Sequence, residues 1–87
     1  MTTEQIIALV AGLLGDYQGD GRPLHILEGG VRFEAGVRHE DDWWHVPVYP
    51  DSPILEQWRY YEFLASVEEQ IEDQNELNIL LVPVAAA

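Results

Sequence analysis

Apolar residues recur with two different periods along this chain of 87 residues. Over residues 6–14 they recur every three or four positions, the spacing of one face of a helix. Over residues 31–38 they alternate with polar residues, the spacing of one face of a strand. Helical spacing returns over residues 54–71, and an unbroken apolar run follows at 79–82. The sequence therefore predicts an α+β fold with the order helix, three strands, helix, strand.

The first helix is expected over residues 3–14. Thr2 is followed three residues later by Gln5, which is the pattern of a capping box at a helix N-terminus. Gly15 ends the apolar spacing and is typical of a helix end. Residues 15–23 are dense in turn-forming residues and predict an exposed loop.

Three strands are expected next, over residues 24–28, 31–39 and 43–49. Gly29-Gly30 has the length and composition of a two-residue hairpin turn, and Glu40 to Asp42 predict a second turn. Strands joined by such short turns pair with their neighbours in antiparallel fashion. The pattern thus predicts an antiparallel meander.

A second helix is expected over residues 53–74, with Asp51 or Ser52 as its N-cap and Pro53 at its first position. Tyr60 and Phe63 would lie on the flank of its apolar face and widen it, which favours either a homodimer interface or a closely wrapped monomer. The apolar face itself is expected to contain Ile54, Leu55, Trp58, Tyr61, Leu64, Ala65, Val67 and Ile71.

The last strand is expected over residues 78–84, because the run 79–82 is apolar without alternation. A strand that follows a crossover helix pairs in parallel when it joins the same sheet. We therefore expect a single two-layer domain over residues 1–87, with a four-stranded mixed sheet packed by two helices. The mixed sheet would combine the meander with one parallel strand.

The charge of the chain limits its partners. Sixteen acidic residues face four arginines and no lysine, which gives a formal net charge of -12. Such a surface repels nucleic acids and lacks a basic membrane anchor, so we expect neither of these partners. The longest apolar run is too short to span a membrane, and a cytoplasmic location is expected. The chain has no cysteine, so its core has no disulfide or thiolate metal site to support it.

Acidic residues crowd the end of the second predicted helix. This position is unfavourable for negative charge, because the helix dipole already places negative potential there. Trp43 and Trp44 are adjacent on a predicted strand, so one of them should point away from the core. We therefore expect a non-catalytic protein-interaction module with a basic protein as partner, or an inhibitor of the immunity type that mimics DNA. The partner-binding residues would be Glu68, Glu69, Glu72, Asp73, Glu76, Trp43 and Trp44.

A second hypothesis is a site for a small ligand or a divalent metal at the turn between the second and third strands. His39, Asp41, Asp42 and His45 carry nitrogen and oxygen donors that suit such ions, and His25 could join them across the sheet. A weak hydrolase would then be the associated activity. No serine lies beside a base in the sequence pattern, so we expect no catalytic residues and no cofactor other than this metal.

Overall fold

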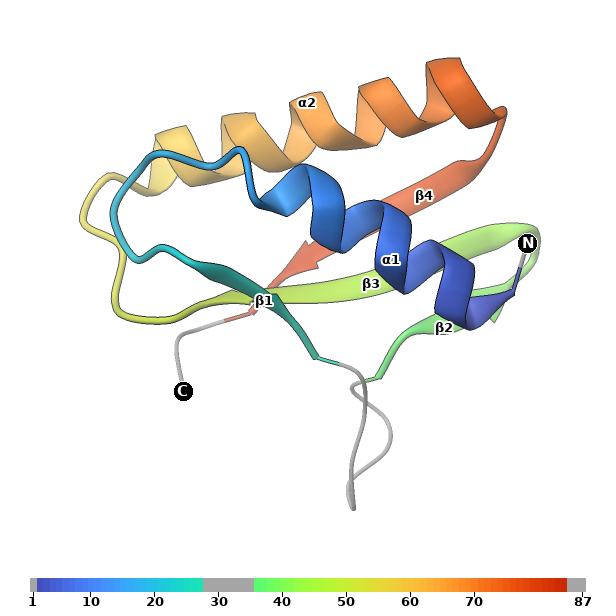
Figure 1. Ribbon diagram of the computed structural model, residues 1–87, viewed down its shortest axis with the longest axis horizontal. Coiled ribbons are helices and arrows are strands. Elements are labelled where there is room, and N and C mark those ends of the chain that lie inside the picture. The colour runs from blue at the N-terminus through green and yellow to red at the C-terminus, as the bar shows by residue number, and fades with distance from the viewer. Residues whose placement is uncertain (1, 28–35, 85–87) are drawn as a thin grey trace.

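The computed structural model describes residues 2–27 and 36–84. Its elements follow the order α1 (Thr3–Leu14), β1 (Leu24–Ile26), β2 (Arg38–Glu40), β3 (Trp43–Pro50), α2 (Gln57–Asn75) and β4 (Asn78–Pro83) (Figure 1). This order and the α+β class confirm the prediction from the sequence. No helix within the described ranges is long and apolar enough to cross a membrane.

The capping box predicted for α1 is present. The side chain of Thr2 accepts a hydrogen bond from the backbone N–H of Gln5, and the side chain of Gln5 accepts one from the backbone N–H of Thr2. These two bonds satisfy N–H groups that have no partner inside the helix. The start of α1 is therefore fixed by residues adjacent in the sequence.

Strand β3 is the centre of the sheet, because every pairing between the described strands includes it. β4 runs parallel to β3, with Trp43 opposite Asn78 and Val48 opposite Pro83. β1 and β2 both run antiparallel to β3, at opposite ends of its other edge. Figure 1 shows α2 running alongside β4, and the two elements are in contact.

The pairing of β1 differs from the predicted meander. β1 pairs with residues 48–50 of β3 and not with β2. The Gly29-Gly30 hairpin turn and most of the strand predicted over 31–39 lie outside the described residues. The three residues of β1 pair with a segment more than twenty residues away in the sequence. The Gly29-Gly30 pattern therefore does not determine the register of β1 among the described residues.

The turn between β2 and β3 is one residue shorter than predicted, because Glu40 belongs to β2 and pairs with Trp43. Asp41 and Asp42 both have left-handed backbone conformations, with φ of 50° and 66°. Two consecutive residues with positive φ are characteristic of a hairpin turn whose twist matches that of the strands. Aspartate tolerates this conformation better than most residues, which explains its presence at both positions.

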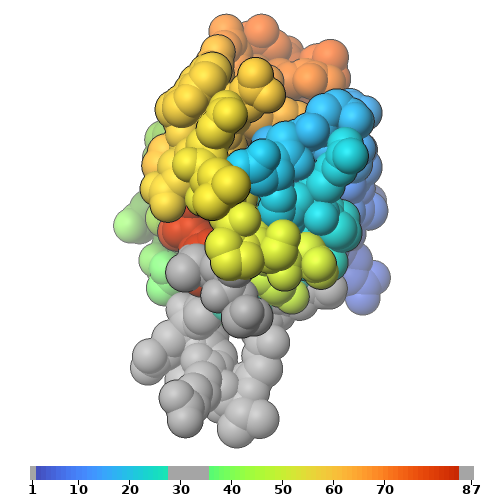
Figure 2. Space-filling model, turned by 90° about the vertical axis from the view of Figure 1, so that its left-hand side faces the viewer, coloured from blue at the N-terminus to red at the C-terminus, as the bar shows by residue number. Residues whose placement is uncertain are grey.

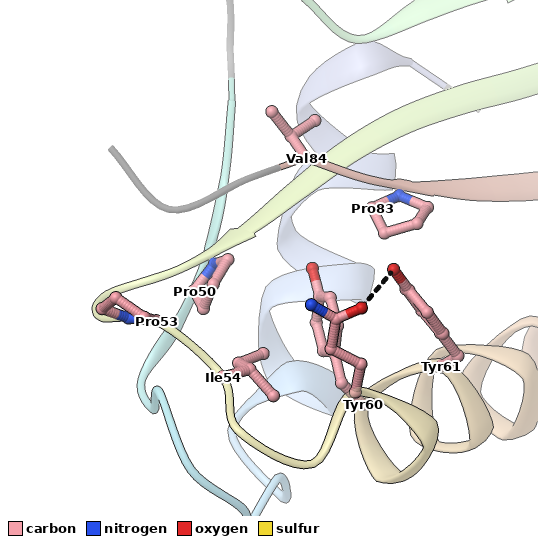
Figure 3. Close-up of a pocket in the computed structure, with 8 residues that line it drawn as sticks. Pro50, Pro53, Ile54, Tyr60, Tyr61, Pro83 and Val84 are labelled. Atoms are coloured by element: carbon pink, nitrogen blue, oxygen red, sulfur yellow. Dashed lines mark hydrogen bonds between the residues drawn. The ribbon is translucent and has the colours of Figure 1, made fainter.

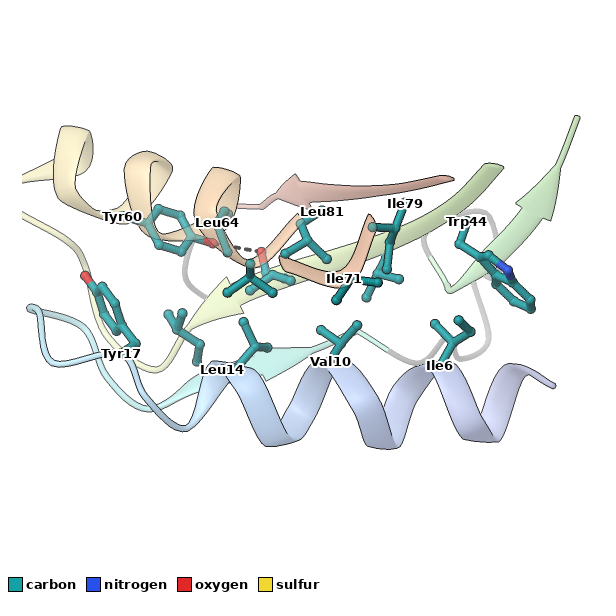
Figure 4. Close-up of a cluster of buried hydrophobic side chains, with 14 residues drawn as sticks. Ile6, Val10, Leu14, Tyr17, Trp44, Tyr60, Leu64, Ile71, Ile79 and Leu81 are labelled. Atoms are coloured by element: carbon teal, nitrogen blue, oxygen red, sulfur yellow. Dashed lines mark hydrogen bonds between the residues drawn. The ribbon is translucent and has the colours of Figure 1, made fainter. Parts of the chain in front are cut away.

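The core is one cluster formed by both helices and by alternate residues of the strands. Figure 4 shows the side chains of α1 pointing toward those of α2 and of the sheet. Tyr60 completes this cluster, and its hydroxyl donates a hydrogen bond of 3.0 Å to the backbone carbonyl of Val48. The fully buried side chains are Ile6, Val10, Val46, Val48, Ile71 and Ile79.

Helix α2 begins at Gln57, four residues after the predicted start, and Asp51 and Ser52 do not cap it. The carboxylate of Asp51 is bound instead to the imidazole of His25, at 3.0 Å. The N–H groups of Leu55 and Glu56, just ahead of the helix, donate to the carboxylate of Asp20 from the loop after α1. The start of α2 thus depends on a residue far away in the sequence.

The loop that carries Asp20 is attached to the rest of the molecule at two further points. Tyr17 is buried against Phe63, with ring centroids 5.1 Å apart, and its hydroxyl donates to the carbonyl of Asp20. Gly21 has a φ of 80°, and a side chain there would collide with the carbonyl of Ser52. The predicted exposed loop is therefore held firmly against the start of α2.

Candidate functional site

The four residues of the predicted metal site do not converge. His39 lies opposite Trp44 and stacks on its ring, with centroids 4.3 Å apart and an interplanar angle of 4°. His45 follows Trp44 in β3, so its side chain points to the face of the sheet opposite to that of Trp44 and His39. Asp41 and Asp42 are exposed at the turn. Within the described ranges, no group of three or more potential ligands is placed to hold a metal ion.

His25 lies far from His45 on the sheet. It is opposite Tyr49, its ring is 5.1 Å from the ring of that residue, and it binds Asp51. Tyr49 is four residues from His45 along β3, which corresponds to about 13 Å. The metal hypothesis therefore remains a prediction without a gathered set of ligands.

The acidic residues at the end of α2 fall into two groups. Glu69, Glu72, Asp73 and Glu76 are exposed, and within the part of the chain that the structure describes none of them forms an ion pair. The last turn of α2 contains no basic residue. Glu72, Asp73 and Glu76, which lie in the last turn or at the C-cap, therefore add their charge to the negative end of the helix dipole.

Glu68 behaves differently from its neighbours. Its side chain is partly buried, and its carboxylate accepts a hydrogen bond of 2.7 Å from the backbone N–H of Leu81 in β4. Burial raises the pKa of Glu68 above its usual value; the bond from Leu81 opposes this effect and the charge of Glu72 adds to it. Glu68 thus connects α2 to β4, a role that only the fold reveals.

The three tryptophans occupy three different environments. Trp44 is buried in the core, whereas Trp43 points away from it and is 41% exposed. The opposite orientation expected for these neighbours is therefore observed. Trp58, on α2, is the most exposed tryptophan, at 62%.

Trp58 and Tyr61 were expected on the buried face of the second helix, and this expectation is wrong. Both are exposed, and Tyr60 occupies the core position instead. The buried stripe of α2 is Tyr60, Leu64, Val67 and Ile71. Trp58 precedes Tyr60 by two residues, which places it about 200° around the helix, on the opposite side. The four residues of this buried stripe are three or four positions apart, so the helical spacing of the sequence could have identified them.

A pocket of about 410 Å³ lies beside Tyr61. It is bounded by α2, by the segment before α2 and by the end of β4, and Figure 3 shows Tyr61 facing Pro83 across it. The hydroxyl of Tyr61 donates to the side-chain oxygen of Gln57 at 3.4 Å. Leu55, which is 88% exposed, precedes α2 at the same end of the molecule. Figure 2 shows this end, with the residues before α2 in yellow and the end of β4 in red.

The exposed aromatic and acidic residues of α2 lie along one face. Successive members of this set are three or four residues apart, so they form a single stripe along the helix. The stripe starts with two aromatic residues and ends with three acidic ones, over a length of about 27 Å at 1.5 Å per residue. We call it the outer α2 stripe; it consists of Trp58, Tyr61, Ala65, Glu69, Glu72 and Glu76, all exposed.

No family model, curated protein or solved structure matches this chain.

Proposed function

We propose that the protein is a non-catalytic interaction module that binds a basic segment of another protein along the outer α2 stripe. The observation that carries this proposal is the arrangement, on one face of one helix, of exposed aromatics and of acids that form no ion pair with any described residue. The proposal takes the domain to have two layers, with both helices on one face of the sheet. The outward face of α2 is then free for a partner, and the core holds the helix rigid.

The aromatic half of the stripe would provide the anchor. Tryptophan and tyrosine contribute most of the binding energy in many protein interfaces, because they bury a large rigid surface. Trp58 and Tyr61 lie on the first two turns of α2 and are exposed, and Tyr61 also lines the pocket at Pro83. A partner that places an apolar side chain there would remove exposed hydrophobic surface from water.

The acidic half would provide the charge complementarity. Glu72 and Glu76, in the last turn of α2 and at its C-cap, are unfavourable for the stability of the helix, so a contribution to folding does not account for them. A field of this sign accelerates association with a cationic partner and selects against anionic ones. An inhibitor that occupies the DNA-binding surface of a basic protein is one form that this function can take.

The test uses two synthetic helical peptides of identical apolar sequence, one with lysine on its polar face and one with glutamate. We expect the lysine peptide to shift the indole N–H signal of Trp58 and the amide signals of residues 58–76 in nuclear magnetic resonance spectra. The glutamate peptide should shift none of them. Binding should weaken as salt is added, because exposed charges are screened.

Two double variants with the same net charge separate this site from general attraction. Glu69→Gln with Glu72→Gln removes two charges from the stripe, whereas Glu4→Gln with Asp16→Asn removes two exposed charges of α1 and the loop after it. We expect only the first pair, and separately Trp58→Ala, to weaken binding. Equal affinity for all three variants and the unaltered protein would refute the proposal.

A further inference from the structure

The pocket beside Tyr61 has two walls that are tied to the same atom of the sheet. The backbone carbonyl of Val48 in β3 accepts a hydrogen bond from the hydroxyl of Tyr60 at 3.0 Å and another from the backbone N–H of Val84 at 2.8 Å. Tyr60 belongs to α2 and Val84 follows β4, so the central strand fixes both sides of the pocket. Binding to a preformed pocket loses less conformational entropy than binding that must first order its site.

The lining of this pocket is apolar, rigid and uncharged. None of the described residues that line it is acidic or basic, although the chain has sixteen acids. Tyr60 and Tyr61 present their rings, with centroids 5.6 Å apart, and Figure 3 shows Pro83 facing Tyr61. Proline rings have a fixed φ, so the walls that they form are stiff. The remaining lining residues are Pro50, Pro53, Ile54, Gln57 and Val84.

An aromatic side chain matches this lining. Aromatic rings attract one another at centroid distances of about 4.5–7 Å, and a buried aromatic side chain removes about 150–250 Å² of its surface from water. The volume of about 410 Å³ is in the range of pockets that hold small ligands, so the bulkiest side chains can enter. The hydroxyl of Tyr61 donates to Gln57 and keeps lone pairs that can accept a bond from an indole N–H.

Glu72 is aligned with this pocket along α2. It follows Tyr61 by eleven residues, which is close to three full turns, so the two side chains lie on the same side of the helix about 17 Å apart. Glu72 is exposed and forms no ion pair with any described residue. A helical partner lying along α2 has the same rise per residue. Two of its residues that are eleven positions apart therefore match this separation.

We propose that the basic partner is a helix with an aromatic residue that enters the pocket and a lysine or arginine eleven residues away that pairs with Glu72. This inference rests on the proposed function, because it states how the outer α2 stripe selects among basic segments. A helix that has only cations engages the acidic end of the stripe and leaves the pocket empty. Specificity is this difference in affinity between the two kinds of helix.

The test compares two isomeric helical peptides, each with one tryptophan and two lysines four residues apart. In the matched peptide the tryptophan lies eleven residues from the nearer lysine, and in the mismatched peptide it lies four residues away on the same face. Calorimetry should show that the matched peptide binds at least about tenfold more tightly, because one buried aromatic anchor commonly dominates an interface. Replacing its tryptophan by alanine should remove this advantage.

Variants of the pocket provide the matched controls on the protein. Val84→Trp places an indole at the rim of the pocket, keeps the backbone bond to Val48 and should abolish the difference between the tryptophan and alanine peptides. Leu80→Trp is the control, because Leu80 is similarly exposed in β4 but does not line the pocket. Tyr61→Ala removes one wall and should act like Val84→Trp. Full discrimination by both pocket variants would refute the proposal.

The charged end of the match has its own control. Glu72→Gln should weaken binding of the matched peptide by about twofold to fivefold, the usual range for an exposed ion pair. Glu62→Gln removes an equal charge from an exposed position near the start of α2 and should have a smaller effect. Equal effects of the two variants would show that the lysine responds to the net charge and not to Glu72.

The outcomes for this inference and for the proposed function can be told apart. If the matched, mismatched and alanine peptides all bind along the outer α2 stripe with equal affinity, the proposed function stands and the aromatic match is refuted. If none of the three peptides binds, both are refuted. A tighter matched peptide whose advantage disappears in Val84→Trp supports both.

Discussion

The two ends of α2 differ in how nearby charges interact with the helix dipole. At the start of the helix, Asp20 places a carboxylate against the N–H groups of Leu55 and Glu56, where negative charge is favourable. At the end of the helix, the last turn has acids and no basic residue. Glu76 also has a left-handed conformation, with φ of 53°, at a position where glycine is typical.

This difference separates residues that stabilise the fold from residues that do not. The start of α2 is held by a buried tyrosine, an acceptor from a distant loop and aromatic contacts with Tyr17. The end of α2 carries charges and a backbone conformation that reduce stability. The partner binding proposed for the outer α2 stripe would account for these residues at the end of the helix.

The largest expected effect tests the anchoring at the start of α2. Tyr60→Ala should lower the free energy of unfolding by about 3–5 kcal/mol, because it empties a core position. Tyr61→Ala, one residue further along and exposed, should change it by less than about 0.5 kcal/mol. Urea denaturation measures both. If Tyr60→Ala does not fold, Tyr60→Phe should cost about 0.5–1.5 kcal/mol through the lost bond to Val48.

A smaller effect is expected for the acceptor at the start of α2. Asp20→Ala should lower the free energy of unfolding by about 0.5–2 kcal/mol, which is the usual range for a lost helix N-terminal acceptor. Asp16→Ala, an exposed aspartate in the same loop, is the matched control. Equal effects of the two variants would show that Asp20 stabilises α2 only through the charge of the loop.

The smallest effect is expected at the end of α2, and it has the opposite sign. Glu72→Lys and Asp73→Lys should each raise the free energy of unfolding by about 0.3–1 kcal/mol at low salt, because a cation is favourable at this end of the dipole. The gain should shrink as salt is added. Glu62→Lys changes the net charge equally but lies near the start of the helix. If it gave the same gain, the relevant quantity would be net charge and not position.

The features that the sequence predicted correctly are those determined by residues close together in the chain. The order of helices and strands and the capping box of α1 follow from local spacing, and the structure confirms both. The register of β1 was not predictable, because Leu24–Ile26 pair with residues 48–50, beyond the reach of any local turn signal. Aspartate is a common N-cap residue, but in the fold the side chain of Asp51 binds His25 instead.

The candidate site shows the same limit. The crowding of acids at the end of α2 is visible in the sequence, but the distinct role of Glu68 depends on Leu81, thirteen residues away in β4. The exposure of Trp58 and Tyr61 depends on the rotation of α2, which Tyr60 fixes by its contact with Val48. Whether a residue of α2 faces the core or the solvent could be predicted only by recognising the complete buried stripe that contains Tyr60, Leu64, Val67 and Ile71.

The central position of β3 also has a consequence for the time course of folding. Its pairing with β2 closes only a two-residue turn, whereas its pairing with β4 joins residue 43 to residue 78 across the whole of α2. Contacts between residues close in sequence form faster, because less chain entropy is lost in closing them. We therefore expect the hairpin to form before β4 docks. Asp42→Gly, which favours the left-handed turn, should then speed refolding in stopped-flow measurements and leave the unfolding rate nearly unchanged.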